Sequence, residues 1–270
     1  MAKRAQKSEL TIAAVRASQD LSATTIPLIM RYFFVPAAWP LTLVALQIGL
    51  SPNGATLLRA AASGGAIFCI SSADLRVHAT GFVLLLLSLI GDSVDGNLCR
   101  IQDRASYFGK FLDGLVDIIT DLLFPLALAA HLWLRGDGDL KVMALSIAGS
   151  LALASIFIVL QRASYFDLVM RKEASSTSID VSAVRHAALR GYLYDGFIGR
   201  LLTWIDKRSM NAVFDIRYTA LIVALITDRL VTYVAFLGCL YITVAIVFDL
   251  NRIVRTYAAL DVSRRSRSVA

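Results

Sequence analysis

Long runs of apolar residues constrain the fold of this chain more than any other feature. Hydrophobic residues make up 57% of its 270 residues, a larger share than in a typical soluble domain. The excess falls in stretches long enough to cross a bilayer. The sequence therefore predicts an all-α integral membrane protein with six transmembrane helices, at about residues 53–73, 77–98, 109–134, 141–168, 214–228 and 230–250.

The region before the first predicted span is basic at its start and rich in proline further on. Residues 1–22 are consistent with an amphipathic helix at the membrane face or with a disordered basic arm. Residues 25–50 contain three prolines, which disturb a spanning helix. We expect an interfacial helix there, with Tyr32 and Trp39 at headgroup depth; a buried span is the alternative. The expected organisation is a basic arm with an interfacial helix, a six-helix membrane domain and a basic tail, at residues 1–52, 53–256 and 257–270.

The basic residues are distributed very unevenly between the two sides of this predicted topology. Of the 27 lysines and arginines, 22 fall on the side of both termini and four on the opposite side. Arg59, near the start of the first span, is expected to reach back to the interface. By the positive-inside rule, both termini and the loop 99–110 face the cytoplasm, across the inner membrane if the source is a bacterium. The basic residues thus report membrane orientation, and no nucleic-acid partner is expected.

Four carboxylates lie in one 26-residue window beside apolar segments. Asp92 and Asp95 are three residues apart, and Asp113 and Asp117 are four apart, so each pair can point one way from its own helix. A short loop joins the two helices, which makes them antiparallel neighbours and brings the pairs together. Carboxylates near hydrocarbon need a counter-charge, and Mg²⁺ or Mn²⁺ prefers oxygen ligands. We expect two such ions, about 4 Å apart, clamping a pyrophosphate.

The window, which reads DSVDGNLCRIQDRASYFGKFLDGLVD, also contains Gly96, Arg100 and Gly109 at fixed spacing. It resembles the signature of the CDP-alcohol phosphotransferase family, D-x-x-D-G-x-x-A-R-x(8)-G-x-x-x-D-x-x-x-D. Cys99 stands where the family usually has alanine. The resemblance implies a membrane enzyme of phospholipid biosynthesis. It would transfer a phosphatidyl group from a CDP-lipid, CDP-diacylglycerol, to an acceptor alcohol or alcohol phosphate and release CMP. It also implies a possible homodimer.

The resemblance assigns roles to individual residues of the window. Asp92, Asp95 and Asp113 would be metal ligands, and Asp117 would be both a ligand of the second metal and the general base. Gly96 has no side chain and lets a nucleotide approach the backbone, whereas Arg100 offers a planar fork for phosphate oxygens.

The resemblance extends to a segment at the start of the first predicted span, Pro52-Asn53-Gly54-Ala55-Thr56. Family members carry a similar segment near the bound cytidine. Asn53 and Thr56 are therefore expected to bind the donor, together with Ser106 near its phosphates. A plain helix cap would explain Asn53 alone.

Two arginines at predicted cytoplasmic helix ends and one aspartate within the third predicted span have two interpretations each. Arg162 and Arg217 either bind the phosphate of an acceptor, as basic residues so placed do in relatives that use phosphorylated acceptors, or anchor the topology. Asp121 continues the face of Asp113 and Asp117. We expect it to be hydrogen-bonded to a neighbouring helix rather than to bind metal.

Two alternatives explain carboxylates in a membrane protein differently. An Asp-rich membrane prenyltransferase also uses Mg²⁺ and pyrophosphate, but it normally shows two distant Asp-rich motifs. A cation or proton transporter also has intramembrane carboxylates, but its sites tend to lie near the midplane in broken helices. Here the carboxylates lie in one window at helix ends on the basic side, which favours the phosphatidyltransferase.

Overall fold

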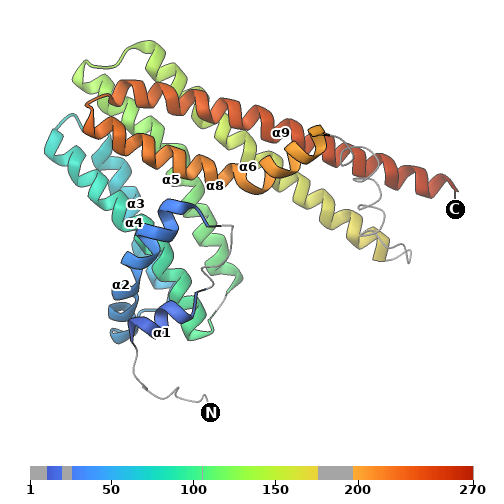
Figure 1. Ribbon diagram of the computed structural model, residues 1–270, viewed down its shortest axis with the longest axis horizontal. Helices are drawn as coiled ribbons and strands as arrows, with labels where there is room; N and C mark the ends of the chain where they lie inside the picture. The colour runs from blue at the N-terminus through green and yellow to red at the C-terminus, as the bar shows by residue number, and fades with distance from the viewer. Residues whose placement is uncertain (1–10, 20–25, 105, 176–196, 270) are drawn as a thin grey trace.

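The computed structural model describes residues 11–19, 26–104, 106–175 and 197–269, and every element in these ranges is helical (Figure 1). The elements, in chain order, are α1 (Ile12–Ala17), the π-helical turn η1 (Met30–Phe34), α2 (Val35–Gln47), α3 (Pro52–Ile70), α4 (Leu75–Gln102), α5 (Tyr107–Arg135), α6 (Leu140–Ser175), α8 (Phe197–Ile226) and α9 (Leu230–Val269).

Four of these helices are long and apolar enough to cross a membrane. They are α4, α5, the part of α6 up to Arg162 and the part of α9 up to Ile253. Two other predicted spans, α3 and α8, are not among the four candidates found in the described residues. The structure therefore supports an all-α membrane protein with four candidate spans, and six spans with an N-terminal interfacial helix stay a prediction.

Several helices are longer than the sequence predicts. The second predicted span was expected to end at about residue 98, but α4 continues to Gln102. Cys99 and Arg100 therefore belong to this helix and not to a loop. Likewise, α8 begins at Phe197, which puts Arg217 well inside the helix and not at its end. The helices α6 and α9 also extend past their predicted ends, to Ser175 and Val269. Arginine, lysine and alanine are good helix formers, so these helices continue where their apolar character stops.

The helices around the motif begin and end at capping residues that the sequence supplies. Ser51 accepts a hydrogen bond from the Gly54 N–H at 3.1 Å, with Pro52 in the first helical position. Ser106 does the same for the Gly109 N–H at 2.9 Å and starts α5. The left-handed Asp103, with φ of 50°, ends α4. Only three residues then separate Asp103 from the start of α5.

The core is built around α5, which packs against α3 on one side and against α6 and α9 on the other. The helices α6 and α9 lie side by side along the length of the molecule, and α3 and α4 form a second pair near α2 (Figure 1). Fully buried side chains such as Leu128, Ile156 and Leu237 fill the space between α5, α6 and α9. Gly149 on α6 faces Gly238 on α9, where an added Cβ would lie 2.8 Å from the facing backbone; these two helices therefore approach closely.

Two contacts tie the ends of the bundle together. Opposite the carboxylates, the buried rings of His78 and His131 stack with centroids 3.5 Å apart. On the N-terminal side, Asp215 of α8 accepts hydrogen bonds from the backbone N–H groups of Leu28 and Ile29, both at 2.9 Å. Asp215 thus caps the helical segment that leads into η1 and α2, although it is far away in the sequence.

Candidate metal and nucleotide site

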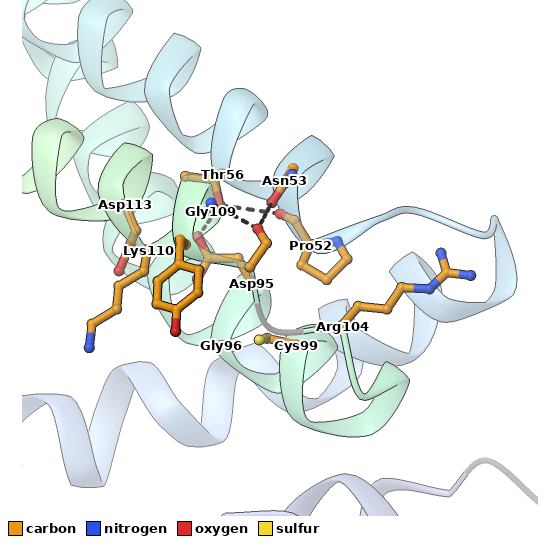
Figure 2. Close-up of a pocket in the computed structure, with 12 residues that line it drawn as sticks. Pro52, Asn53, Thr56, Asp95, Gly96, Cys99, Arg104, Gly109, Lys110 and Asp113 are labelled. Atoms are coloured by element: carbon orange, nitrogen blue, oxygen red, sulfur yellow. Dashed lines mark hydrogen bonds between the residues drawn. The ribbon is translucent and has the colours of Figure 1, made fainter.

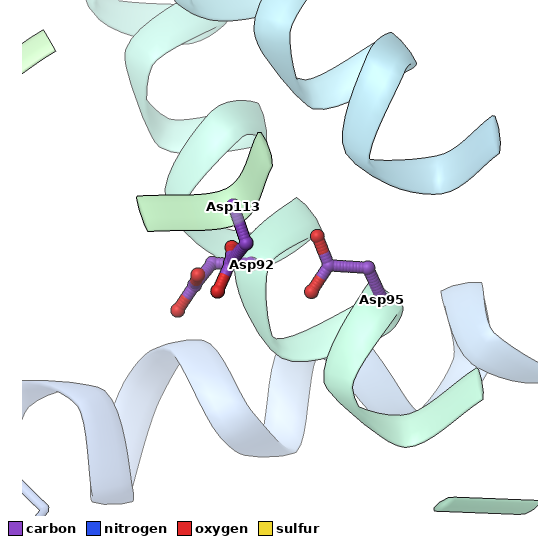
Figure 3. Close-up of side chains that lie close together, drawn as sticks. All are labelled: Asp92, Asp95 and Asp113. Atoms are coloured by element: carbon purple, nitrogen blue, oxygen red, sulfur yellow. The ribbon is translucent and has the colours of Figure 1, made fainter. Parts of the chain in front are cut away.

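Three of the four predicted carboxylates form a cluster between α4 and α5. Each of Asp92, Asp95 and Asp113 offers an oxygen, and these oxygens lie within 4.8 Å of one another. Figure 3 shows Asp92 and Asp95 from α4 facing Asp113 from α5. Asp95 is buried, and the other two are half-buried. Carboxylates of both pairs therefore come together as predicted, although α4 and α5 each pack against α3 and make little direct contact with each other.

Asp117 lies one turn further along α5, and its partner is an arginine that the sequence analysis placed elsewhere. Arg59 of α3 donates to Asp113 and to Asp117, and its guanidinium lies 2.9 Å from Asp92. Its side chain is only 4% exposed. The expectation that Arg59 reaches back to the interface was wrong, because the neighbouring carboxylates offer a charged guanidinium partners inside the bundle.

The pattern of α3 contains a signal for this contact. Thr56, Arg59 and Ser63 are spaced as one helical face, and all three are buried. An arginine on the same face as the predicted donor residue Thr56 is directed toward α4 and α5, not toward lipid.

A cavity of about 520 Å³ adjoins the carboxylates at the beginning of α3 and α5. Figure 2 shows its lining, which comes from α3, α4, α5 and the connection between the last two. The lining includes predicted donor-binding residues together with two of the carboxylates: Asn53, Thr56, Gly96, Ser106, Asp95 and Asp113. Thr56 donates to Asp95 at 2.9 Å, which links the cavity wall directly to the carboxylate cluster.

Gly109 lies where the first turn of α5 meets the start of α3. A Cβ at this position would lie 2.6 Å from Oδ1 of Asn53 and 2.9 Å from Oγ of Ser106. An added Cβ would displace these two side chains, so glycine lets Asn53 and Ser106 keep their positions beside α5. The fixed Gly109 of the motif therefore has a packing reason at the mouth of the cavity.

Arg100 is not among the residues that line the cavity, but it folds back along α4 beside Gly96, which does line it. Its guanidinium donates to Oδ1 of Asn97 at 2.7 Å and lies 3.5 Å from the place where a Cβ of Gly96 would be. The cationic residues that line the cavity are Arg104 and Lys110, both exposed. Sequence reasoning missed these two, although they lie in the same predicted basic loop.

The two arginines predicted at the acceptor differ from each other. Arg217 is buried and donates to Asp121 at 2.6 Å, to Tyr241 at 3.0 Å and to Tyr218 at 3.1 Å. Asp121 therefore has the hydrogen bond to a neighbouring helix that the sequence predicts. Arg162, near the end of the apolar part of α6, is exposed. The structure does not bring these two arginines into contact with the carboxylate cluster.

The residues present fit a divalent cation. A hard cation prefers several carboxylate oxygens, and the cluster of Asp92, Asp95 and Asp113 offers an all-oxygen donor set within the necessary reach. The side chain of Asp117 is more exposed than the others, at 53%, and lies next in line on the same face of α5. It could complete a second ligand set.

A model of the CDP-alcohol phosphatidyltransferase family matches residues 49–205, which is more than half of the chain. The chain therefore belongs to this family, as the motif predicted. The matched region includes the cavity and all four carboxylates. This membership favours the transferase prediction over the prenyltransferase and transporter alternatives.

Curated relatives are similar over part of their length. The chain is 33% identical over 114 residues to a phosphatidylinositol phosphate synthase of Streptomyces avermitilis, which is 42% of this chain and 45% of the relative. It is 35% identical over 104 residues to an archaetidylinositol phosphate synthase of Aeropyrum pernix, which is 38% of this chain and 50% of the relative. The chain thus spans about half the length of the curated relatives it matches.

Proposed function

We propose that this protein transfers a phosphatidyl group from CDP-diacylglycerol to an acceptor alcohol, releases CMP, and depends on Mg²⁺ or Mn²⁺. One observation carries the proposal: three carboxylates with oxygens within 4.8 Å of one another border a cavity of about 520 Å³. The cavity has a volume suited to a nucleotide-sized ligand. Carboxylates, a divalent cation and a pyrophosphate form a familiar combination in phosphoryl transfer.

The donor would lie with its cytidine toward the start of α3. Asn53 and Thr56 line this part of the cavity, and the amide and hydroxyl can hydrogen-bond a pyrimidine. Gly96 leaves room for the pyrophosphate beside α4. Ser106 and Arg100 would bind its oxygens, since a hydroxyl and a guanidinium both donate to phosphate.

In the reaction, a hydroxyl oxygen of the acceptor forms a bond to the phosphorus that carries the diacylglycerol. The bond from that phosphorus to the bridging oxygen of CMP breaks, and CMP leaves with the electron pair. Asp117 accepts the proton of the attacking hydroxyl as the general base. Two divalent ions held by Asp92, Asp95, Asp113 and Asp117 would stabilise the charge that develops on the pyrophosphate oxygens.

The acceptor in this proposal is an inositol phosphate. Two relatives are named as synthases of inositol phosphate lipids, and two arginines lie on the helices α6 and α8 that follow the motif. Arg162 is exposed and free to meet an acceptor phosphate from the solvent side. Arg217 would act from within the bundle, in contact with Asp121, one turn beyond Asp117 on α5.

The proposal also includes the membrane arrangement. Six spans, cytoplasmic termini and a cytoplasmic active site agree with the distribution of basic residues. This placement would expose the cavity to soluble inositol phosphate and to CMP release on the cytoplasmic side. A homodimer and the membrane domain at residues 53–256 are part of the same proposal.

The test is CMP release by the purified protein in lipid nanodiscs. CDP-diacylglycerol and Mg²⁺ or Mn²⁺ are supplied with a panel of acceptors: inositol phosphate, inositol, glycerol 3-phosphate and serine. We expect turnover that requires the cation and is fastest with inositol phosphate. Turnover with another acceptor alone would contradict the acceptor assignment, and absence of CMP release with every acceptor would contradict the donor assignment.

A further inference from the structure

A side-chain hydrogen bond joins the segment after α1 to a buried asparagine of the motif. Gln19 follows α1 and donates from Nε2 to Oδ1 of Asn97, a residue of the motif on α4 that has no exposed surface. The same Oδ1 accepts the hydrogen bond from Arg100 at 2.7 Å. Gln19 and Arg100 are therefore joined through one oxygen atom.

Neighbouring groups fix the orientation of the Asn97 amide. Thr42 of α2 gives its hydroxyl proton to the Ala38 carbonyl at 2.7 Å, so its oxygen can only accept from Asn97 Nδ2, which lies 3.1 Å away. The amide nitrogen must then face α2, and Oδ1 must face Arg100 and Gln19.

The orientation of Gln19 is fixed in the same way. The indole N–H of Trp39 is a donor only, and it lies 2.9 Å from Oε1 of Gln19. The Nε2 of Gln19 therefore faces Asn97. The guanidinium of Arg16 lies 5.6 Å from the centre of the Trp39 ring, and Val15 of α1 is fully buried, which holds this segment against α2.

We propose that Gln19 and Asn97 are positioning residues for Arg100, so that the N-terminal segment holds the phosphate-binding guanidinium of the motif in place. This inference rests on the proposed function, in which Arg100 binds the donor pyrophosphate. A guanidinium has five N–H donors; the bond to Asn97 orients the group and leaves other donors for phosphate oxygens. Without Gln19, Oδ1 of Asn97 loses one of its two donors, and Arg100 is held by an amide that only Thr42 still anchors.

The test is a double-mutant cycle with Gln19→Ala and Arg100→Ala. Gln19→Ala should raise KM for CDP-diacylglycerol roughly fivefold, the effect of about one hydrogen bond, and leave KM for the acceptor unchanged. In the Arg100→Ala background it should have no further effect, because the group that it positions is gone. Gln47→Ala, an exposed glutamine at the end of α2, is the matched control and should behave like wild type.

Equal effects of Gln19→Ala in both backgrounds would overturn the proposal, as would an unchanged donor KM. Thermal unfolding of the same four proteins measures the link between Gln19 and Arg100 without turnover. Non-additive changes in Tm support the link, and additive changes refute it. If wild type releases no CMP, the proposed function fails on its own assay, while the Tm cycle still decides whether Gln19 acts through Arg100.

Discussion

Arg59 on α3 donates to Asp117 on α5. The same guanidinium also contacts Asp92 and Asp113, so it touches three of the four motif carboxylates. We predict that Arg59→Gln reduces turnover at least tenfold and lowers the free energy of unfolding by about 3 kcal/mol, as expected when a buried ion pair loses one partner. Arg59→Lys should be intermediate, since an ammonium cannot contact three carboxylates in a planar fork.

CMP release and chemical denaturation of the same preparations check this prediction. Arg76→Gln, an exposed arginine at the start of α4, is the control for the loss of a positive charge. Wild-type turnover in Arg59→Gln would show that the guanidinium is not needed to hold the carboxylates in place.

The carboxylate cluster predicts metal dependence. Chelation with EDTA should abolish turnover, and Mg²⁺ or Mn²⁺ should restore it, because four carboxylates cannot clamp a pyrophosphate without cations. Mn²⁺ binding, followed by electron paramagnetic resonance, should be weakened in Asp95→Asn and in Asp113→Asn. Full activity in EDTA would exclude a metal-dependent reaction.

Asp113 and Asp117 should differ in their effects. Asp113→Asn is expected to reduce kcat by several orders of magnitude and to weaken metal binding. Asp117→Asn should also inactivate the protein but leave donor binding largely intact if its chief role is that of the base. Equilibrium binding of CDP-diacylglycerol to the two variants separates these roles, and equal loss of donor binding would argue against a base at Asp117.

Cys99 offers a native reporter for both the cavity and the orientation. The residue lines the cavity, so CDP-diacylglycerol with Mg²⁺ should slow its alkylation by a water-soluble thiol reagent. If the cavity faces the cytoplasm, an impermeant thiol reagent outside intact cells should not modify Cys99. Modification from outside would reverse the proposed orientation.

The two acceptor arginines should give different phenotypes. Arg162→Ala should raise KM for inositol phosphate roughly tenfold, the size of a lost charge-assisted hydrogen bond, with donor KM unchanged. Arg217→Ala removes the partner of Asp121 and of two tyrosines, so it should also lower Tm. Asp121→Asn is the control, because it weakens the Arg217–Asp121 pair while leaving Arg217 in place. If Asp121→Asn raises the acceptor KM as much as Arg217→Ala does, Arg217 acts through structure and not through contact with the acceptor.

The sequence predicted the features that depend on local spacing. The two Asp pairs point one way from their helices, because this follows from helical periodicity. The cap that Ser106 provides for α5 was not predicted, since Ser106 was assigned only to the donor phosphates. The partners of Arg59 depend on which face of α3 meets α4 and α5, and the only sequence signal for them is that Arg59 shares a helical face with Thr56.

Helix ends were the weakest part of the prediction. The sequence placed Cys99 and Arg100 in a loop because charged residues begin there, but apolar character marks the membrane boundary and not the end of a helix. Taking the end of an apolar run for the end of a helix also placed Arg217 at a helix end. In α8 the helix begins at Phe197, and the charged residues before Arg217 are compatible with helix because their propensities are high.

The cap that Asp215 provides has a consequence for the order in which the protein is made. Its carboxylate is synthesised 186 residues after Ile29 and 187 residues after Leu28, yet it satisfies the N–H groups that open the first long helical segment. While the ribosome is still producing α3 to α6, that segment lacks its cap. The segment that begins at Leu28 and leads into α2 is therefore among the last parts of the protein to gain all its hydrogen bonds, even though it is among the first to leave the ribosome.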